Sequence, residues 1–463
     1  MGMVDKDVII AAQAALIAEQ DQLIRALRAQ IQKLEEEIAH LKKDSNNSSK
    51  PPSSDIVKPK RPRRRGRRKR GGQPGHRKFT RPAFPPDQVD QVEVIELPPA
   101  QAAGLIKLDE YAVLQQVELP EKMYHITEYR ACKYLDPATG RILTAPLPPE
   151  IRQGGLCGAR LSALIAFLKS SCHGSFATIQ RYCREVLHLP ISLGQLAKVL
   201  QKVSSALAQP YARLQAQLPR EPNLGSDETG HHDRGRLYWL WCLQTPRFDF
   251  FHISRSRGSK VLFRLLGRRF RGVVNSDYFS SYRKFARLGR VRMQYCLAHL
   301  IREIRFLEKH RRASLARWAK ILLGILRKMF KSWHRQGEIT PETLRAGLLR
   351  RREAFLRTVR QPPRHKLAVK LARRFRGEHA ADYFRFIEGP GLEPTNNASE
   401  RALRHAVIDR KVTQGTCGPA GRRWRERSWT VVGTCLKQNR NILHYFHQAL
   451  RAHWLRQPAP QLI

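Results

Sequence analysis

The chain has 463 residues, and its 85 Lys and Arg against 39 Asp and Glu give a formal net charge of +46. Such a charge predicts a polyanionic partner, with DNA or RNA as the first candidate, because neutralised phosphates release counterions. A ribosome-associated protein is the alternative. No apolar run approaches the roughly 20 residues that span a bilayer, and no leader pattern opens the chain. We therefore expect a soluble, cytoplasmic protein without a membrane partner.

The eight cysteines are scattered and include no Cys-x-x-Cys pair, so neither a zinc ribbon nor a dithiol redox motif is written in the sequence. Cys296 and His299 form a single Cys-x-x-His, which supplies only half of the ligands that a structural zinc needs. Zinc is therefore not expected as a cofactor. The large size and the unpatterned cysteines favour a reducing compartment.

Residues 1–44 are predicted to form one helix with a heptad pattern. One heptad position holds only isoleucine, at Ile10, Ile17, Ile24, Ile31 and Ile38. The position three residues later holds Gln13, Gln20, Leu27, Leu34 and Leu41. Isoleucine at a with leucine at d favours a parallel two-stranded coiled coil, and hence a homodimer. The alternative is an amphipathic helix that packs on the body of its own chain.

Residues 45–82 are predicted to be a disordered basic linker. Its first part is rich in Ser, Asn and Pro and cannot build a core. Ten Lys or Arg follow within the thirteen residues 58–70. Charges this dense repel one another unless DNA phosphates neutralise them, although a solvated tail is the alternative. The residues assigned to DNA phosphates here are Arg63, Arg64, Arg65, Arg67, Arg68, Lys69 and Arg70.

Short apolar runs separated by prolines continue through residues 83–155, and we interpret them as a small β-containing module. Residues 92–97 and 111–119 are two examples of these runs. Residues 156–215 are predicted to be helical, with helices at 161–168, 178–186 and 193–207 and with Ser192 as an N-cap. Two short helices around a Pro-containing break predict a helix-turn-helix whose second helix enters the major groove. An ordinary three-helix cluster is the alternative.

Residues 216–300 and 389–450 are predicted to form an α/β core. The expected elements are strands at 223–227, 236–244 and 248–253, a helix at 260–266, and strands at 272–276 and 292–296. In an RNase H-like sheet, three strands joined by hairpins are followed by further strands that add to the sheet in parallel, and the order expected here is the same. In that order, Asp227 and Asp277 leave neighbouring central strands side by side.

Asp227, Asp277 and Glu400 are the candidate catalytic and metal-binding residues. Phosphoryl transfer on DNA uses two hard cations about 3.5–4 Å apart, and carboxylates are the ligands that Mg²⁺ or Mn²⁺ prefers. Glu400 would lie on a helix that begins near residue 397. Asn396, four residues before it, and Arg404, four residues after it, would share its face of that helix. The residues assigned to DNA phosphates beside the metals are Asn396, Arg404, Arg410 and Lys411.

Residues 301–388 contain two arginine-rich amphipathic stretches, 315–333 and 343–359. Either these helices clamp DNA, or they form a helical bundle whose charged face is exposed to solvent. The sequence leaves both possibilities open. Trp424 stands among arginines and would suit stacking on an unpaired base, with a core position as the alternative.

Several motifs occur in an order that resembles the DDE transposases of bacterial insertion sequences, in particular the IS66 type. They are Asp44-Ser-Asn-Asn-Ser-Ser-Lys-Pro-Pro-Ser-Ser-Asp55, Gly71-Gly-Gln-Pro-Gly-His76, Ser226-Asp-Glu-Thr-Gly230, Asp277-Tyr-Phe279, Cys296-Leu-Ala-His299, Thr395-Asn-Asn-Ala-Ser-Glu-Arg401 and Asp409-Arg-Lys411. The resemblance implies an RNase H-like core, the triad Asp227, Asp277 and Glu400 with Mg²⁺, and a helical insertion at 301–388.

Two departures from the resemblance matter. Relatives often carry the cysteine pairs of a zinc ribbon before the core, where this chain has only Cys132. Many relatives have Asp before Asn-Asn, where this chain has Thr395, so Glu400 would carry its side of the site alone.

The expected fold is therefore multidomain α+β, with a coiled-coil helix, a small β module, a helix-turn-helix and an RNase H-like core that carries a helical insertion. The expected function is a bacterial transposase, nucleoid-associated when bound, that cuts element-end DNA and joins it to target DNA. A catalytically inactive DNA-binding regulator and a nuclease that cuts without joining are the alternatives. The sequence leaves open whether element-encoded accessory proteins take part.

Overall fold

The computed structural model describes residues 6–41, 82–109, 111–389 and 391–463. Except for its last residue, the predicted basic linker lies outside these residues, and so do the seven arginines and lysines that we assigned to DNA phosphates in it. Among the described residues, no helix is both long enough and apolar enough to cross a membrane.

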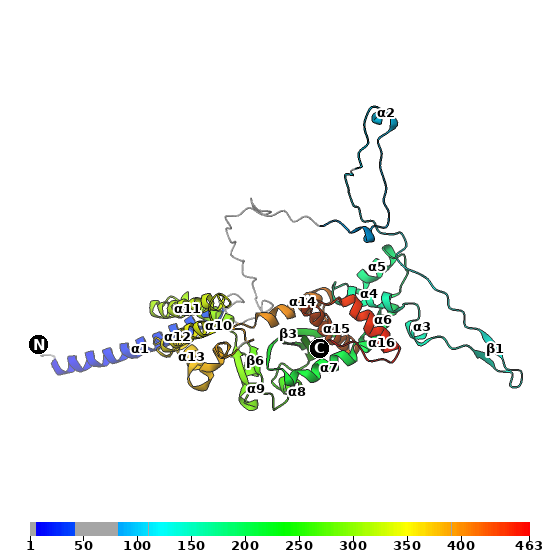
Figure 1. The fold of residues 1–463 in the computed structure, drawn as a ribbon. Helices are drawn as coiled ribbons and strands as arrows, with labels where there is room; N and C mark the ends of the chain where they lie inside the picture. Colours follow the sequence, from blue (N-terminus) through cyan, green and yellow to red (C-terminus); the bar gives the residue numbers. More distant parts are fainter. Residues whose placement is uncertain (1–5, 42–81, 110, 390) are drawn as a thin grey trace.

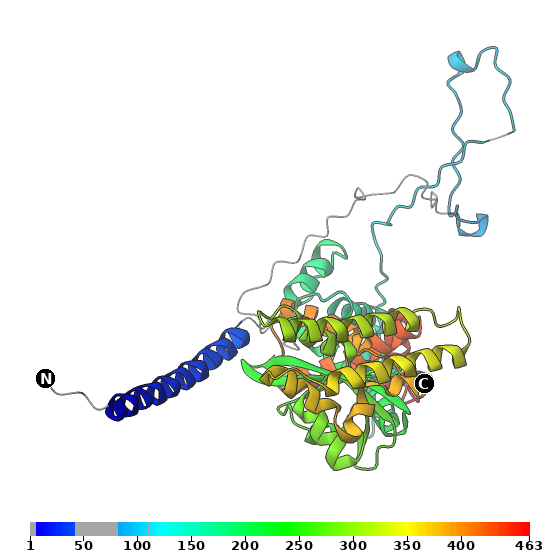
Figure 2. The ribbon, with the colours of Figure 1, turned by 90° about the vertical axis from the view of Figure 1, so that its left-hand side faces the viewer.

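The N-terminal helix α1 runs without interruption over Lys6–Leu41, as the heptad pattern predicts. Its isoleucines remain exposed: Ile10 and Ile17 are each 61% exposed and Ile24 is 43% exposed. The apolar stripe is therefore not covered by the body of the same chain, and Figure 2 shows the helix extending away from it. The pairing of this stripe with the same helix of a second protomer stays a prediction.

The segment before residue 149 differs from the predicted β module. Its elements are the 3₁₀ turn η2 (Pro86–Gln88), the short helix α2 (Pro99–Ala102) and one hairpin of β1 (Lys133–Leu135) and β2 (Ile142–Thr144). The apolar runs 92–97 and 111–119 form no strand, and the β structure of this segment is the β1–β2 hairpin. They follow the β pattern but meet no partner strand, and Ile95 is 91% exposed. Figure 1 shows this segment looping away from the body.

The helical segment that follows contains the predicted helices. They are α3 (Pro149–Gly154), α4 (Ala159–Ser170), α5 (Phe176–Glu185), α6 (Leu193–Ala206) and α7 (Ala208–Gln217). Ser192 caps α6, because its Oγ accepts a hydrogen bond from the Gln195 N–H at 3.2 Å. Helices α4 and α6 pack against α16 (Ile442–Trp454), so this segment shares one core with the C-terminus.

A mixed five-stranded sheet forms the centre. Its strands are β3 (Asn223–Asp233), β4 (Arg236–Gln244), β5 (Asp249–Ser254), β6 (Val273–Ser276) and β7 (Arg292–Tyr295), in the order β5-β4-β3-β6-β7. The first three are antiparallel, and β6 and β7 continue in parallel from β3. The predicted strands are confirmed, although β3 is longer than expected. Helices α8 (Lys260–Leu266) and α9 (Ser280–Gly289) belong to the connections around β6.

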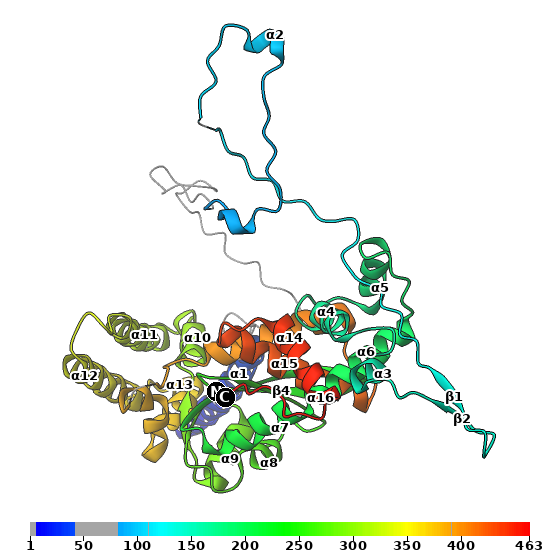
Figure 3. The same ribbon diagram turned by 45° about the vertical axis from the view of Figure 1, so that its right-hand side comes forward.

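Two layers of helices cover the sheet, and strand alternation decides which side chains face each layer. On one face, Leu403 of α14 (Asn397–Thr413) and Trp429 of α15 (Pro419–Lys437) pack with Cys242 and Phe251. On the other face, Tyr282 of α9 lies in the larger core. Figure 3 shows α14 and α15 above the strands and α8 and α9 below them.

The predicted helical stretch is present between β7 and α14. It comprises α10 (Leu297–Glu308), α11 (Ala313–Trp333), α12 (Pro341–Arg360), α13 (Lys366–Ala372) and the 3₁₀ turns η4 (Arg373–Phe375), η5 (Gly377–Tyr383) and η6 (Arg385–Ile387). The α11–α12 pair lies at the opposite end of the molecule from α5 and α6 (Figures 1 and 3). The two ends of the stretch meet, because the Leu297 N–H donates to the Pro394 carbonyl at 2.9 Å.

Candidate active site

The parallel pairing of β3 with β6 sets the positions of the two candidate aspartates. Gly225 pairs with Asn275, which is the last registered pair of these strands. Asp227 and Asp277 each lie two residues further along. Because parallel neighbours in a sheet are about 4.8 Å apart, the register brings these two positions to the same end of adjacent strands.

Gly225 lets the helix that carries Glu400 approach the sheet closely. A Cβ atom at this position would lie 2.3 Å from Ser399 Oγ and 3.0 Å from Asn396 Oδ1. Strand alternation puts the Asp227 side chain on the same face as Gly225. Asp227 therefore faces the layer in which α14 begins, and Glu400 lies in the first turn of that helix.

Buried amides fix the start of α14 above the strand ends. The Asn275 Nδ2 group donates to the carbonyls of Glu393 and Thr395, at 2.8 and 3.0 Å. The Asn396 Nδ2 group donates to the Ser226 carbonyl at 2.8 Å. Since a buried amide left without partners would be costly, these bonds tie the loop before Glu400 to both aspartate-bearing strands.

The acidic side chains raise one another's pKa. Burial raises the pKa of Asp227 well above its usual range, and the negative charges of Glu228, Asp277 and Glu400 add to that effect. Burial also raises the pKa of Asp277, which the Phe279 N–H partly opposes by donating to Asp277 Oδ1 at 3.0 Å. Mutual repulsion of this kind is relieved when a cation binds.

Glu228 is adjacent to Asp227 but belongs to the opposite layer. Its Oε2 accepts a hydrogen bond from the Tyr282 hydroxyl at 2.5 Å, and its Oε1 pairs with Arg257 at 2.9 Å. Burial and the charge of Asp277 raise the pKa of Glu228 to about 7. The alternation of β3 thus separates two neighbouring acids, and only Asp227 faces α14.

Glu400 is turned toward α10. Its Oε1 lies 3.6 Å from Arg302 Nη2 and 3.8 Å from His299 Nε2. Burial lowers the pKa of His299 to about 4, so that imidazole is neutral at neutral pH. Glu400 Oε1 has no hydrogen-bond partner among the described residues. The carboxylate is therefore held by one arginine and retains capacity for a further ligand.

The three carboxylates suit a hard divalent cation in donor type and in charge, because oxygen ligands are what Mg²⁺ prefers. In the described part of the chain, however, no three His, Cys, Asp or Glu side chains are gathered so as to hold a metal ion. The backbone positions converge, and the Glu400 side chain points to Arg302 instead.

Comparison with protein families decides the class of this protein. The profile of the transposase IS66 family matches residues 154–422, which include all three candidate acids. The chain belongs to the IS66 transposase family. A second family, described only as DUF6444, a family of unknown function, matches residues 11–82. A comparison with curated proteins gives no match.

The IS66 match includes four of the eleven residues that we assigned to DNA, and these four differ in exposure and in their contacts. Arg404 and Lys411 are exposed on α14, where they are accessible to a partner. Arg410 is half-buried and its Nη1 donates to Thr229 Oγ1 at 3.3 Å. Asn396 is 3% exposed and both its Nδ2 and its backbone N–H are bonded within the protein. The amide of Asn396 therefore anchors the start of α14, and contact of this residue with DNA stays a prediction.

The alternatives for two other residues are also decided. Trp424 is 6% exposed, which favours its core position over base stacking. Cys296, the cysteine of the lone Cys-x-x-His, accepts a hydrogen bond from the Asn396 N–H through its Sγ at 3.1 Å. It therefore helps to hold the start of α14 in this IS66 family member.

Sequence reasoning missed Gly225, Asn275 and Arg302 as site residues. A glycine inside a strand marks a close approach of another segment, and an asparagine inside a buried apolar strand needs internal partners. Those two signals were present in the sequence. Arg302 carried no such signal, because it is one of many arginines on amphipathic helices.

We expect Gly225→Ala to destabilise the fold by about 1–3 kcal/mol, the usual cost of overpacking. The new methyl group would collide with Ser399 Oγ and push α14 off the sheet. The thermal unfolding midpoint measures this loss. Gly225→Ala combined with Ser399→Ala should recover part of it, whereas an unchanged midpoint in the single variant would contradict the close approach. Gly230→Ala in the same strand is the control, because its nearest neighbour is 3.5 Å away.

Proposed function

We propose that this protein cuts element-end DNA and joins the freed end to target DNA in a metal-dependent reaction. The observation that carries the proposal is the anchoring of α14 over β3 and β6, which brings the helix of Glu400 to the strand ends of Asp227 and Asp277. The strand order β5-β4-β3-β6-β7 supports an RNase H-like core. The family supports transposition as the setting.

In this proposal, Asp227, Asp277 and Glu400 hold two Mg²⁺ or Mn²⁺ ions. Bound metal would activate the attacking oxygen and stabilise the leaving oxygen. Glu400 leaves Arg302 and His299 when it turns toward the aspartates. Arg302 is then free for the DNA backbone, so one rotamer change completes the carboxylate set and exposes a cation beside it.

The chemistry proceeds in two displacements. In the first, water attacks a phosphodiester at the element end, the P–O bond to the 3′ oxygen breaks, and a 3′ hydroxyl is released. In the second, that hydroxyl attacks a target phosphodiester, a new P–O bond forms, and the target's own 3′ oxygen leaves with the proton. No side chain acts as nucleophile, so no covalent link between protein and DNA forms.

The test uses the purified full chain with duplex DNA that contains an element end and with a plasmid target. Joined products are expected with Mg²⁺ or Mn²⁺ and are expected to disappear with EDTA. Cut but unjoined DNA would favour the nuclease alternative. Binding without any cutting would favour the regulator.

The N-terminal helix is proposed to pair two protomers, so that each acts on one end of the element. Ile24→Lys with Leu27→Lys places charges in the apolar stripe of α1, which is otherwise exposed, and should convert dimer to monomer. Gln22→Lys adds a charge on the outer face of the same helix and should leave the dimer intact. Analytical ultracentrifugation distinguishes the two states. A wild-type chain that sediments as a monomer would rule out this role for the helix.

A further inference from the structure

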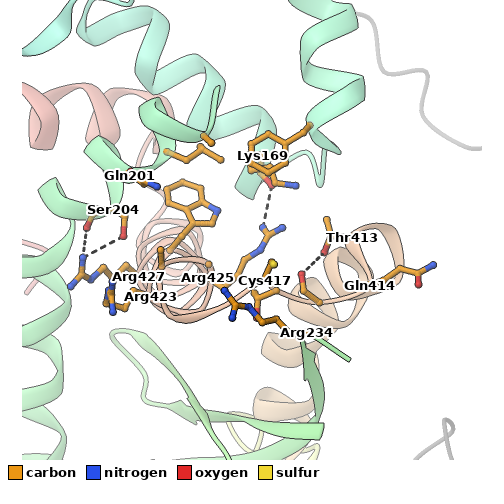
Figure 4. A pocket seen from close by; sticks show the side chains of 18 of the residues that line it. Lys169, Gln201, Ser204, Arg234, Thr413, Gln414, Cys417, Arg423, Arg425 and Arg427 are labelled. Carbon is orange, nitrogen blue, oxygen red and sulfur yellow. Dashed lines mark hydrogen bonds between the residues drawn. The ribbon is translucent and has the colours of Figure 1, made fainter. Parts of the chain in front are cut away.

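A hollow of about 740 Å³ lies at the junction of the helical segment with the C-terminal helices (Figure 4). Residues of α4 and α6 form one wall, the β3–β4 turn forms another, and the connection from α14 to α15 forms the third. This junction basin, as we call it, is separate from Asp227, Asp277 and Glu400, none of which lines it. Its labelled residues in Figure 4 include Lys169, Gln201, Arg234, Cys417, Arg423 and Arg427.

The lining of the junction basin is strongly cationic. It contains five Lys or Arg side chains and no Asp or Glu. Arg425 is neutralised by buried Asp409 at 2.7 Å, and Arg427 donates to the Ser204 carbonyl at 2.8 Å. Arg234 and Arg423 are exposed, and neither makes an ion pair or a side-chain hydrogen bond with the described residues. A concave site with unpaired cations and no acid attracts an anion.

Backbone and side-chain donors add to the charge. Helix α15 begins at the basin, its N-cap Gly418 has no side chain to cap it, and Ala420 and Gly421 of its first turn line the hollow. The Gly418 N–H already donates to Asp233 Oδ1 at 2.7 Å and Pro419 has no N–H, so this 19-residue helix offers a phosphate its dipole and the N–H groups of Ala420 and Gly421. Trp424 also lines the basin, is 6% exposed, and its indole N–H has no partner among the described residues. A buried donor of this kind lacks an acceptor that a phosphate oxygen would supply.

The position of the basin relative to the catalytic acids suggests which phosphate it takes. Glu400 stands in the first turn of α14, and Gln414, just after the last turn, lines the basin. Fourteen residues of helix at 1.5 Å each span about 21 Å. That length corresponds to about six base pairs of B-DNA, at roughly 3.4 Å each.

We propose that the junction basin binds a backbone phosphodiester of element-end DNA about six base pairs from the bond that is cut. The inference rests on the proposed function and extends it to a second contact with the same DNA. Duplex DNA that lies along α14 would meet the acids at one end of the helix and the basin at the other. The basin would thus set the distance between the bound sequence and the cut.

Cys417 provides a reporter, because it is exposed and lines the basin. In a Cys172→Ser background, 40-base-pair element-end DNA should slow maleimide modification of Cys417 at least fivefold. Cys132, which is exposed in the segment of β1, serves as the internal control and should react at an unchanged rate. Inorganic phosphate at millimolar concentration should protect little. Equal protection by phosphate alone would make the basin a small-anion site and overturn the assignment to DNA.

A second measurement separates the basin from the catalytic proposal. Without divalent metal, the logarithm of the DNA-binding constant is plotted against that of the salt concentration. Arg234→Ala and Arg423→Ala should each lower the slope by about 1, as expected for a lost phosphate contact. Arg264→Ala, at an exposed position of α8 on the other face of the sheet, should leave the slope unchanged.

A methylphosphonate substitution scan along the DNA locates the contact. A neutral group about six base pairs from the cut should weaken binding by the wild-type chain and have no further effect on Arg423→Ala. Slopes equal to wild type in both arginine variants would overturn the basin proposal while leaving DNA cutting intact. Absence of DNA cutting with unchanged binding would instead refute the catalytic proposal alone. A wild-type chain that binds no DNA would overturn both.

Discussion

Asp227→Asn is expected to lower DNA cutting and joining by at least about a thousandfold, which corresponds to roughly 4 kcal/mol of transition-state stabilisation. Asn keeps the shape of the side chain but removes the charge that a divalent ion needs, and such ions contribute several kcal/mol in phosphoryl transfer. The position is sensitive because Asp227 faces α14 and lies close enough to Asp277 and Glu400 for their negative charges to raise its pKa. Cleavage and joining of element-end DNA with Mg²⁺ measure the loss.

Glu228→Gln is the matched control, since it changes the neighbouring acid on the other face of β3. Its carboxylate bonds Tyr282 and Arg257 instead of facing α14. We expect it to retain most of the rate at a modest cost in stability. Both variants should bind end DNA like the wild type in the absence of metal. Joining by purified Asp227→Asn at a rate near that of the wild type would remove Asp227 from the catalytic set.

Asp409→Ala is expected to destabilise the protein by about 3–5 kcal/mol, the usual cost of leaving one buried charge without its partner. Asp409 is completely buried and its Oδ2 lies 2.7 Å from Arg425 Nη1, which is itself almost fully buried. The pair links α14 to α15, and burial raises the pKa of Asp409 against the influence of Arg425. The urea midpoint of the C-terminal core, followed by tryptophan fluorescence, measures the effect.

The double variant Asp409→Leu with Arg425→Met tests the reason for that loss. It removes both charges and keeps comparable volume, so it should recover most of the lost stability. If the double variant is no more stable than Asp409→Ala alone, the cost comes from packing and not from the uncompensated guanidinium. Asp382→Ala provides a comparison, because its partner Arg385 lies nearer the surface.

Periodicity and strand order made the elements of the core predictable. The five strands and the helix at 260–266 appear where alternation and apolar runs placed them. Ser192 caps α6 as its position before an apolar period indicated. The start of the Glu400 helix was also predicted to within one residue. Local sequence is informative at such positions, because a cap satisfies backbone groups of its own helix and the period of the apolar residues indicates the type of element.

The errors arose where tertiary contacts decide the outcome. Residues 92–97 alternate like a strand but have no partner, and a sheet requires one. Asn396 lies four residues before Glu400, yet only the fold shows that its amide is buried and bonds the Ser226 carbonyl. The position of the Glu400 side chain could not be predicted either, since its partner Arg302 lies in α10, nearly a hundred residues earlier in the chain.

The hydrogen bond between Leu297 and Pro394 makes the α10–α13 stretch a side branch that leaves and re-enters the core at one point. Its far tip is the turn between α11 and α12, where Gly337 is exposed with a φ of +95°. A fluorescent protein spliced into this turn would extend the branch outward while its base stays closed. The protein thus carries, in this exposed turn, an attachment point for following single molecules.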